Sequence, residues 1–251
     1  MKTMTRRSAL RVGGGGLFAL LGAKVSPAWL KEDGMRDSAD ALDHLLVGTP
    51  DLEEGIAWFE KLTGVRPAIG GSHPGRGTRN ALASLGGRHY LEVIAPDPAQ
   101  AGVTAEQVTR LKNLRDPQAV QWAASSSDMA ATKKLVEASG IRFMGPTPGS
   151  RKRPDGRLLR WSTLNLEDPT LLLPFFIHWE PDSVHPSQDS PSGCKLVGLR
   201  FESPKPEECA AQFRKIGLRA EVSAGARPQI IATLMTPRGK VEIGPGGRLG
   251  K

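Results

Sequence analysis

The first residue of this chain that could do chemistry is His44, the single imidazole in the apolar stretch of residues 42–48. The stretch reads Leu-Asp-His-Leu-Leu-Val-Gly, which is typical of a short buried strand. A histidine in such a strand can bind a divalent metal ion through a ring nitrogen. It can equally be a core residue whose nitrogens are satisfied by hydrogen bonds, so both roles are open at this point.

A second group of polar residues surrounds the glycine-rich residues 70–77. The backbone N–H groups of this segment could cradle an anion, although ordinary hairpin turns require the same glycines. His73, Thr78 and Asn80 lie in or just after the segment, at the mouth of a predicted strand. We expect these three side chains to bind substrate beside His44.

A third candidate is a group of five cations within ten residues: Arg151, Lys152, Arg153, Arg157 and Arg160. Guanidinium groups bind carboxylates and phosphates in a bidentate way. Arg151 is therefore a candidate for gripping an anionic substrate. The alternative is a hairpin whose charges are simply solvated.

A strand-then-helix pattern that could position these residues occurs three times. Its strands are predicted at residues 42–47, 119–124 and 196–201, which are 77 residues apart both times. Each predicted helix ends at a glycine followed by an aliphatic residue, and two or three strands follow. The pattern therefore predicts an α+β protein built from three βαβββ-like units.

The predicted units span residues 40–95, 119–180 and 194–244. Residues 29–39 are a linker before the first unit. Residues 96–118 connect the first two units and include a short predicted helix, and residues 181–193, rich in proline and serine, connect the last two.

The net charge of +8 is concentrated at the N-terminus. Residues 1–28 contain five cations and no acid, so the rest of the chain carries only +3. With one tyrosine and no mixing of basic and aromatic residues, that remainder gives little reason to expect nucleic-acid binding. We expect a small-molecule partner instead, and the oligomeric state is open.

Residues 1–28 have the features of an export signal. Residues 5–11, Thr-Arg-Arg-Ser-Ala-Leu-Arg, resemble the twin-arginine pattern, and a glycine-broken apolar run with a Ser-Pro-Ala cleavage site follows. The alternatives are a basic tail or an uncleaved anchor. We expect an exported protein, periplasmic or extracellular, with no membrane span after the signal is removed.

Cys194 and Cys209 are the two cysteines of the chain. They lie at the start of a predicted strand and in the following helix, and a strand of about eight residues spans about 26 Å. Because a disulfide requires Cα atoms within about 7 Å, we expect two free, buried thiols.

Tandem βαβββ units with a histidine in the first strand and a glutamate in the last resemble the vicinal oxygen chelate superfamily. More narrowly, residues 40–244 are similar to the glyoxalase-like domain family. The matching segments are residues 42–44, 71–80, 90–92, 149–156 and 173–177. The resemblance implies curved mixed sheets around a cup-shaped pocket that is open at His44.

The resemblance also implies a metal site. His44 and Glu92 stand at the superfamily's ligand positions, and Gln121 stands at the position of His44 in the second unit. The position equivalent to Glu92 in that unit falls near Phe175 or Phe176, which cannot bind metal. His178 and Glu242 are two further candidates to complete the ligand set.

The function implied is an exported enzyme that uses Zn, Ni, Mn or Fe. Two adjacent substrate oxygens would chelate the ion, with Glu92 or Glu242 as the base, in a lyase, isomerase or dioxygenase reaction. The alternative is a metal-free protein that binds or sequesters a small molecule, with His44 and Asn80 as hydrogen-bond partners. A structural or interaction role is a third option.

Overall fold

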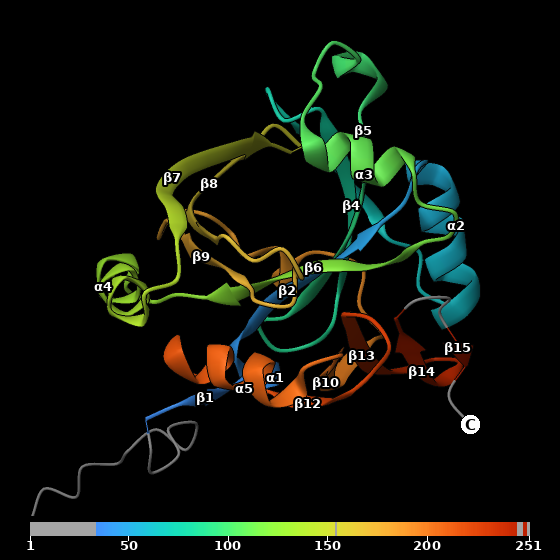
Figure 1. The fold of residues 1–251 in the computed structure, drawn as a ribbon. Helices are drawn as coiled ribbons and strands as arrows, with labels where there is room; N and C mark the ends of the chain where they lie inside the picture. The colour runs from blue at the N-terminus through green and yellow to red at the C-terminus, as the bar shows by residue number, and fades with distance from the viewer. Residues whose placement is uncertain (1–33, 154, 245–247, 250–251) are drawn as a thin grey trace, which may run out of the picture.

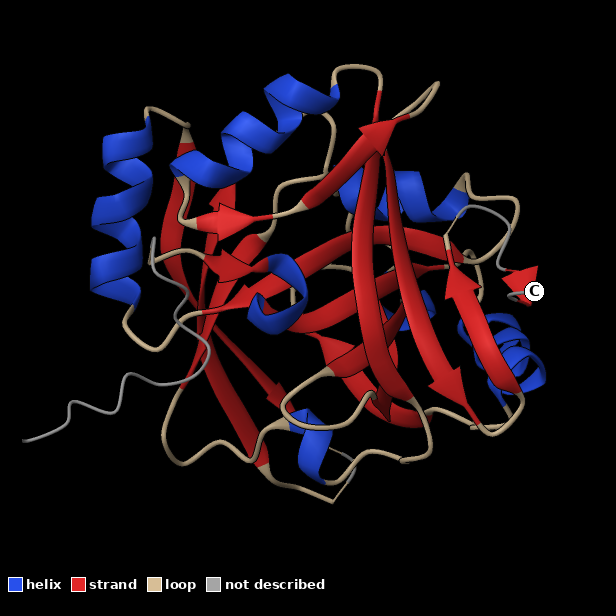
Figure 2. Cartoon of the chain, turned by 90° about the horizontal axis from the view of Figure 1, so that it is seen from below, coloured by secondary structure: helices blue, strands red, loops and turns tan. Residues whose placement is uncertain are grey.

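The computed structural model of the protein describes residues 34–153, 155–244 and 248–249. Two main β-sheets pack together, and helices lie around their outside (Figures 1 and 2). This is the mixed α+β architecture predicted from the sequence. The predicted export signal, residues 1–28, lies outside the described residues. Among the described helices, none combines the length and the apolar character that a membrane span requires.

The first two units together build one eight-stranded sheet. Its strands are β2 (Leu42–Gly48), β3 (Ala68–His73), β4 (Thr78–Ser84), β5 (Tyr90–Pro96), β6 (Gln118–Ser125), β7 (Phe143–Lys152), β8 (Leu158–Leu166) and β9 (Phe175–Trp179). Their order is β3-β4-β5-β2-β6-β9-β8-β7. The first strands of the two units, β2 and β6, are therefore neighbours at the centre of the sheet, paired antiparallel.

The large sheet curls until its two edge strands meet (Figure 1). β3 and β7 stand at opposite ends of the strand order but are in contact. At this seam the guanidinium of Arg151 donates a hydrogen bond to the carbonyl oxygen of Gly70. The curled sheet is the cup that the family resemblance implied.

The third unit forms a separate five-stranded sheet with the order β12-β10-β13-β14-β15. Its strands are β10 (Lys195–Ser203), β12 (Glu221–Ala224), β13 (Gln229–Thr236), β14 (Gly239–Ile243) and β15 (Arg248–Leu249). A two-stranded sheet pairs β1 (Arg36–Asp37) with β11 (Leu218–Arg219). The first two units thus pair their strands alike, with the first strand parallel to the last, whereas in the third unit β10 lies between β12 and β13.

Each unit contributes one main helix. The helices are α1 (Ser38–Ala41), α2 (Leu52–Thr63), α3 (Glu106–Lys112), α4 (Met129–Ser139) and α5 (Pro206–Lys215), with 3-10 turns η1 (Pro98–Gln100) and η2 (Pro186–Gln188). The predicted stop glycines of α2 and α4 adopt left-handed φ angles of 82° and 74°. The connector between the first two units forms α3, as predicted.

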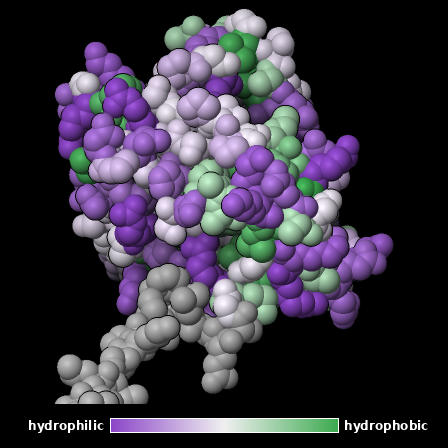
Figure 3. Space-filling view, turned by 90° about the vertical axis from the view of Figure 1, so that its left-hand side faces the viewer, coloured by the Kyte–Doolittle hydropathy of each residue, from purple (hydrophilic) through white to green (hydrophobic). Residues whose placement is uncertain are grey.

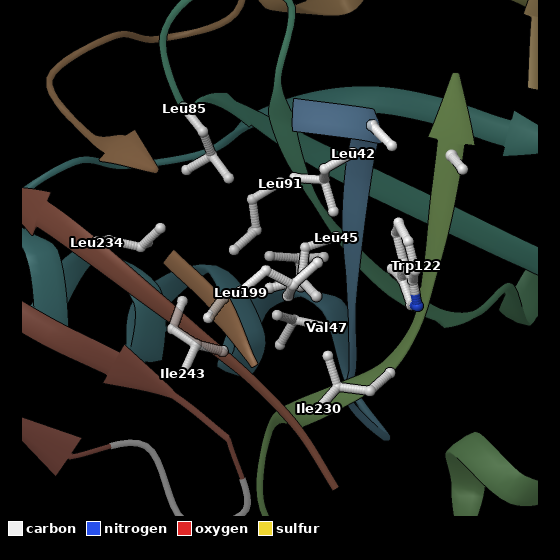
Figure 4. Close-up of a cluster of buried hydrophobic side chains, with 14 of the residues drawn as sticks. Leu42, Leu45, Val47, Leu85, Leu91, Trp122, Leu199, Ile230, Leu234 and Ile243 are labelled. Atoms are coloured by element: carbon white, nitrogen blue, oxygen red, sulfur yellow. The ribbon is translucent and has the colours of Figure 1, made fainter. Parts of the chain in front are cut away.

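The main hydrophobic core lies between the two sheets (Figure 4). Trp122 of β6 is fully buried, and its ring centroid lies 5.7 Å from that of Phe201 and 6.3 Å from that of Phe213. The indole N–H of Trp122 donates to the carbonyl of Leu172. The third unit is therefore held on the large sheet by aromatic packing.

Both cysteines are free thiols, as predicted, although only Cys194 is fully buried. The outer surface mixes hydrophilic and hydrophobic residues, as Figure 3 shows for the side that lies on the left in Figure 1. In the described part of the chain the large exposed apolar side chains come from different elements: Ile69, Leu135, Met144, Leu158, Val197 and Met235.

Phe201→Ala should lower the free energy of unfolding by about 3–5 kcal/mol, because it leaves a cavity between the two sheets. Urea denaturation measures this change. Leu135→Ala is the control, since that side chain is 43% exposed and its loss should change the free energy by less than about 0.5 kcal/mol. Equal effects of the two substitutions would contradict the proposed packing of the third unit.

Candidate functional site

A cavity of about 700 Å³ opens inside the curl of the large sheet. This volume suits a small organic molecule, since ligand sites typically measure about 300–1,000 Å³. Seven residues named from the sequence line it together: His44, His73, Thr78, Asn80, Glu92, Gln121 and Arg151.

Strand pairing brings the central residues together. β2 runs parallel to β5, with His44 opposite Tyr90 and Leu46 opposite Glu92. Since alternate residues of a strand share a face, His44 and Glu92 point to the same side of the sheet. Asn80 of the next strand, β4, is opposite Ile94 and joins the same face.

Asp43 holds the ring of His44 through the ring nitrogen Nδ1. Its carboxylate accepts from His44 Nδ1 at 2.8 Å, from His185 Nε2 at 3.1 Å and from Trp179 Nε1 at 3.1 Å. The proton of His185 lies on Nε2, because its Nδ1 accepts from the backbone N–H of Ser187. Asp43 therefore receives three N–H donors in a site that is 1% exposed.

These contacts keep Asp43 ionised. Burial alone would raise the pKa of Asp43, but hydrogen bonds from His185 and His44, together with their charges, lower it to about 2. A carboxylate can only accept, so the proton that His44 shares with it must belong to His44 Nδ1. The other ring nitrogen, Nε2, is then the one that can take a proton or a metal ion.

His44 Nε2 faces the carboxylate of Glu92, with 3.4 Å between Nε2 and Oε2. The imidazole stacks on the ring of Tyr90 at 4.5 Å and meets the edge of Phe175 at 5.5 Å, so its orientation is restrained on both sides. When Nε2 carries no proton, its lone pair and those of the Glu92 carboxylate repel each other at this distance. A proton or a cation between them removes the repulsion.

Asn80 links Glu92 to His73. Its Nδ2 donates to Glu92 Oε1 at 2.8 Å and to His73 Nε2 at 3.1 Å. His73 Nε2 is thus an acceptor, and its Nδ1–H donates to the hydroxyl of Thr78 at 2.9 Å. Burial lowers the pKa of His73, and Arg151 lowers it further against the opposing charge of Glu92. His73 is therefore a neutral hydrogen-bonding group.

Gly70 leaves room for two of the side chains in the cavity. A Cβ at this position would overlap Asn80 Oδ1 and would lie 3.1 Å from Arg151 Nη1. Asn80 Oδ1 is buried and has no hydrogen-bond partner among the described residues. The glycine-rich segment that contains Gly70 forms the β3–β4 hairpin, so turn geometry accounts for much of its composition.

The five clustered cations divide between the cavity and the outer surface, where Lys152 is exposed. Arg151 is 3% exposed and lines the cavity, and burial lowers its pKa while the charge of Glu92 opposes this. Three others are paired with acids outside the cavity: Arg153 with Asp189, Arg157 with Asp155, and Arg160 with Asp182. Most of the cluster is thus a charged hairpin, and Arg151 alone of the five faces the cavity.

Three other candidate ligands have different surroundings. Gln121 lines the cavity, and its amide donates to the carbonyl of Leu173 at 3.2 Å. His178 of β9 points to the opposite face, where Nδ1 contacts the carbonyl of Ser126 at 2.8 Å. Glu242 belongs to the other sheet.

Neither His178 nor Glu242 lines the cavity. Strand alternation turns His178 away, because its neighbours Ile177 and Trp179 point inward. Glu242 lies in β14 and pairs with Arg200 at 3.3 Å. These two side chains therefore do not complete the ligand set around His44 and Glu92.

His44 and Glu92 fit as two ligands of one divalent ion. Ligand atoms about 2.1 Å from a tetrahedral metal lie about 3.4 Å apart, which matches the 3.4 Å between His44 Nε2 and Glu92 Oε2. In the described residues there is no group of three or more His, Cys, Asp or Glu side chains arranged to hold a metal. The remaining ligands would come from Gln121, substrate or water.

The family profile of the glyoxalase-like domain matches residues 42–217. The chain belongs to the glyoxalase-like domain family. The match covers all of the large sheet and the start of the third unit, so the cavity lies within the matched residues apart from its lining residues 227–230. No curated protein sequence matches the chain.

A solved structure shares the fold of this glyoxalase-like domain. A hypothetical protein from Staphylococcus aureus is similar with a TM-score of 0.59 and 14% identity, over 74% of this chain and 87% of that one. Methylmalonyl-CoA epimerase from Mycobacterium tuberculosis aligns with a TM-score of 0.43 and 23% identity, over 56% of this chain and 89% of that one. The first of these similarities supports the fold and nothing beyond it.

Reasoning from sequence missed the residues that support His44. Asp43 precedes it directly, so a carboxylate adjacent to a candidate ligand was an available signal. No such signal identifies His185, because it lies in the linker between the second and third units, 142 residues from Asp43. Tyr90 and Trp179 are further contacts that no local pattern predicts.

Asp43→Asn should switch the proton of His44 from Nδ1 to Nε2. The amide oxygen would stay with His185 and Trp179, which together supply two donors to the same carboxylate oxygen. The amide NH2 would then face His44 Nδ1 and require it to accept. Imidazole ¹⁵N shifts, assigned with His44→Gln, measure the proton position.

The same substitution should lower the free energy of unfolding by about 1–3 kcal/mol, because a charged hydrogen bond is lost. A His44 ring that stays protonated at Nδ1 in Asp43→Asn would show that Asp43 does not set its tautomer. His178→Gln is the control, and it should leave the signals of His44 in place.

Proposed function

We propose that this glyoxalase-like domain is an enzyme that acts on a small, oxygenated, anionic substrate with the help of a divalent metal. The supporting observation is the buried pair of His44 Nε2 and Glu92 Oε2, 3.4 Å apart in the cavity. Asp43 occupies the other nitrogen of His44 and so directs Nε2 toward the cavity. A carboxylate behind a metal-binding histidine is the usual way to fix such a ligand.

The side chains of the cavity have distinct roles in this proposal. His44 and Glu92 would hold Zn, Ni, Mn or Fe, and the ion when bound would supply Lewis-acid stabilisation to a substrate oxygen. Arg151 would bind the negative group of the substrate. Asn80 and His73 would orient the carboxylate of Glu92.

Glu92 is also the group best placed to move a proton. Its Oε1 accepts from Asn80, and its Oε2 lies toward His44 and the cavity. Proton transfer to and from a carbon beside a carbonyl is what a lyase or an isomerase of this kind requires. A dioxygenase reaction would require molecular oxygen and a redox-active metal in addition.

A metal-free binding protein is the second candidate. One observation favours it: among the described residues no third acidic or histidine side chain joins His44 and Glu92 as a metal ligand, and Glu92 Oε1 already accepts a hydrogen bond from Asn80. In that case His44 and Asn80 would offer hydrogen bonds to a bound molecule. Metal content separates the two candidates.

Protein purified without chelator should contain about one divalent ion per chain. His44→Ala and Glu92→Gln should each reduce metal affinity by about tenfold or more, since each removes one of the two side-chain ligands. Elemental analysis and metal titration measure this. His178→Ala is the matched control and should retain the ion, because His178 lies on the opposite face of the sheet. Metal-free wild-type protein that still binds a small molecule would favour the second candidate.

The proposal includes export through the twin-arginine route. It is supported by residues 5–11 and by the cleavage motif that ends at Ala28. Export in the folded state suits a metalloprotein, because the ion can be bound before transport.

The mature protein should begin at Trp29, and replacing Arg6 and Arg7 by lysine should abolish processing. N-terminal sequencing of fractionated host cells tests this, and a cytosolic protein with an intact Met1 would contradict it.

A further inference from the structure

A second hydrophobic cluster, separate from the main core, forms one wall of the cavity. Leu46, Ile94 and Leu111 are at most 5% exposed. Three partly buried side chains pack against them, so that the cluster consists of Leu46, Ile94, Leu111, Leu114, Val120 and Phe175. All six line the cavity.

This apolar wall begins next to the candidate metal ligands. Leu46 follows His44 by two residues on β2, and Ile94 follows Glu92 by two residues on β5. Residues two apart share a face of a strand and lie about 6.6 Å from each other. A molecule whose polar end meets His44 and Glu92 therefore places its other end against the apolar wall.

The connector between the first two units completes the wall. Gly48, the last residue of β2, allows α3 and the residues after it to approach closely. A Cβ on Gly48 would lie 2.7 Å from Leu111 Cδ2, 2.8 Å from Val120 Cγ1 and 2.9 Å from Leu114 Cδ1. The connector is thus packed directly on the central strand and is part of the cavity.

The charges that line the cavity are mostly positive. Arg76, Arg110, Arg151 and Arg227 line it, and Glu92 is the one carboxylate among the described residues of the lining. Arg227 comes from the third unit and Arg110 from α3, so cations reach the cavity from several parts of the chain. This balance favours an anionic ligand.

We propose that the substrate is an amphipathic acid, in which a carboxylate with an adjacent oxygen is joined to an apolar body of aromatic or branched aliphatic type. The oxygenated end lies at His44, Glu92 and Arg151. The body lies against Leu46, Ile94 and the connector. This inference rests on the proposed function for its polar end, whereas the apolar wall is independent of any metal.

Binding of two 2-hydroxy acids to the full chain tests the proposal. Lactate and mandelate have the same carboxylate and hydroxyl, but mandelate carries a phenyl group in place of a methyl group. Isothermal titration should show mandelate binding about tenfold or more tightly than lactate, because the phenyl group enters an apolar pocket. Benzyl alcohol, which lacks the carboxylate, should bind at least about tenfold more weakly than mandelate.

Two substitutions in the apolar wall test whether it causes the preference for mandelate over lactate. Leu114→Asn and the nearly isosteric Val120→Thr should each bring mandelate toward the affinity of lactate and leave lactate unchanged. Leu135→Asn on the outer helix α4 is the control and should leave both affinities as they are. Denaturation midpoints show whether each variant is folded. If Leu114→Asn does not fold, Val120→Thr provides the test by itself.

Equal binding of mandelate and lactate, or binding of neither, would overturn the amphipathic acid. Benzyl alcohol binding as tightly as mandelate would overturn it as well, because the anionic end would then contribute nothing. Metal content measured on the same preparation tests the proposed metal-dependent function separately from the amphipathic substrate. Retention of the ion through His44 and Glu92 without a preference for mandelate would leave the proposed function standing and remove this inference alone.

Discussion

The buried carboxylate of Asp43 is the constraint on which the rest of the site depends. It accepts N–H groups from His44, His185 and Trp179, which belong to three different segments of the chain. An ionised group with so little exposure is tolerated only because all three donors are present. The same contacts that stabilise the charge also determine which nitrogen of His44 faces the cavity. Stability and chemistry are thus coupled through one side chain.

The linker between the second and third units has a role beyond connecting them. It carries His185 to Asp43, and its Asp189 pairs with Arg153 at the tip of the β7–β8 hairpin, 2.7 Å apart. The carbonyl of Ser187 accepts from the hydroxyl of Ser84 on β4. A proline-rich segment thereby joins the two halves of the curled sheet.

The connector between the first two units and the third unit add walls to the cavity inside the curled sheet. α3 packs on β2 because Gly48 has no side chain, and it supplies Leu111 to the cavity wall. The third unit docks through Phe201 and Phe213 on Trp122, and its Arg227 reaches the cavity. Each addition contributes both packing and lining residues. The cavity is therefore a product of the whole arrangement rather than of one repeat.

Local sequence was sufficient to predict the repeated units, the helix ends and seven of the polar residues that line the cavity. Strand periodicity, a capping glycine and a strand histidine are short-range signals, and each acts within a few residues. Only the tertiary structure decided that the first two units share a sheet, that His178 and Glu242 lie elsewhere, and that His185 reaches Asp43. These outcomes depend on strand register and on contacts between distant residues. A shift of one residue in register would turn His44 out of the cavity without any change in local pattern.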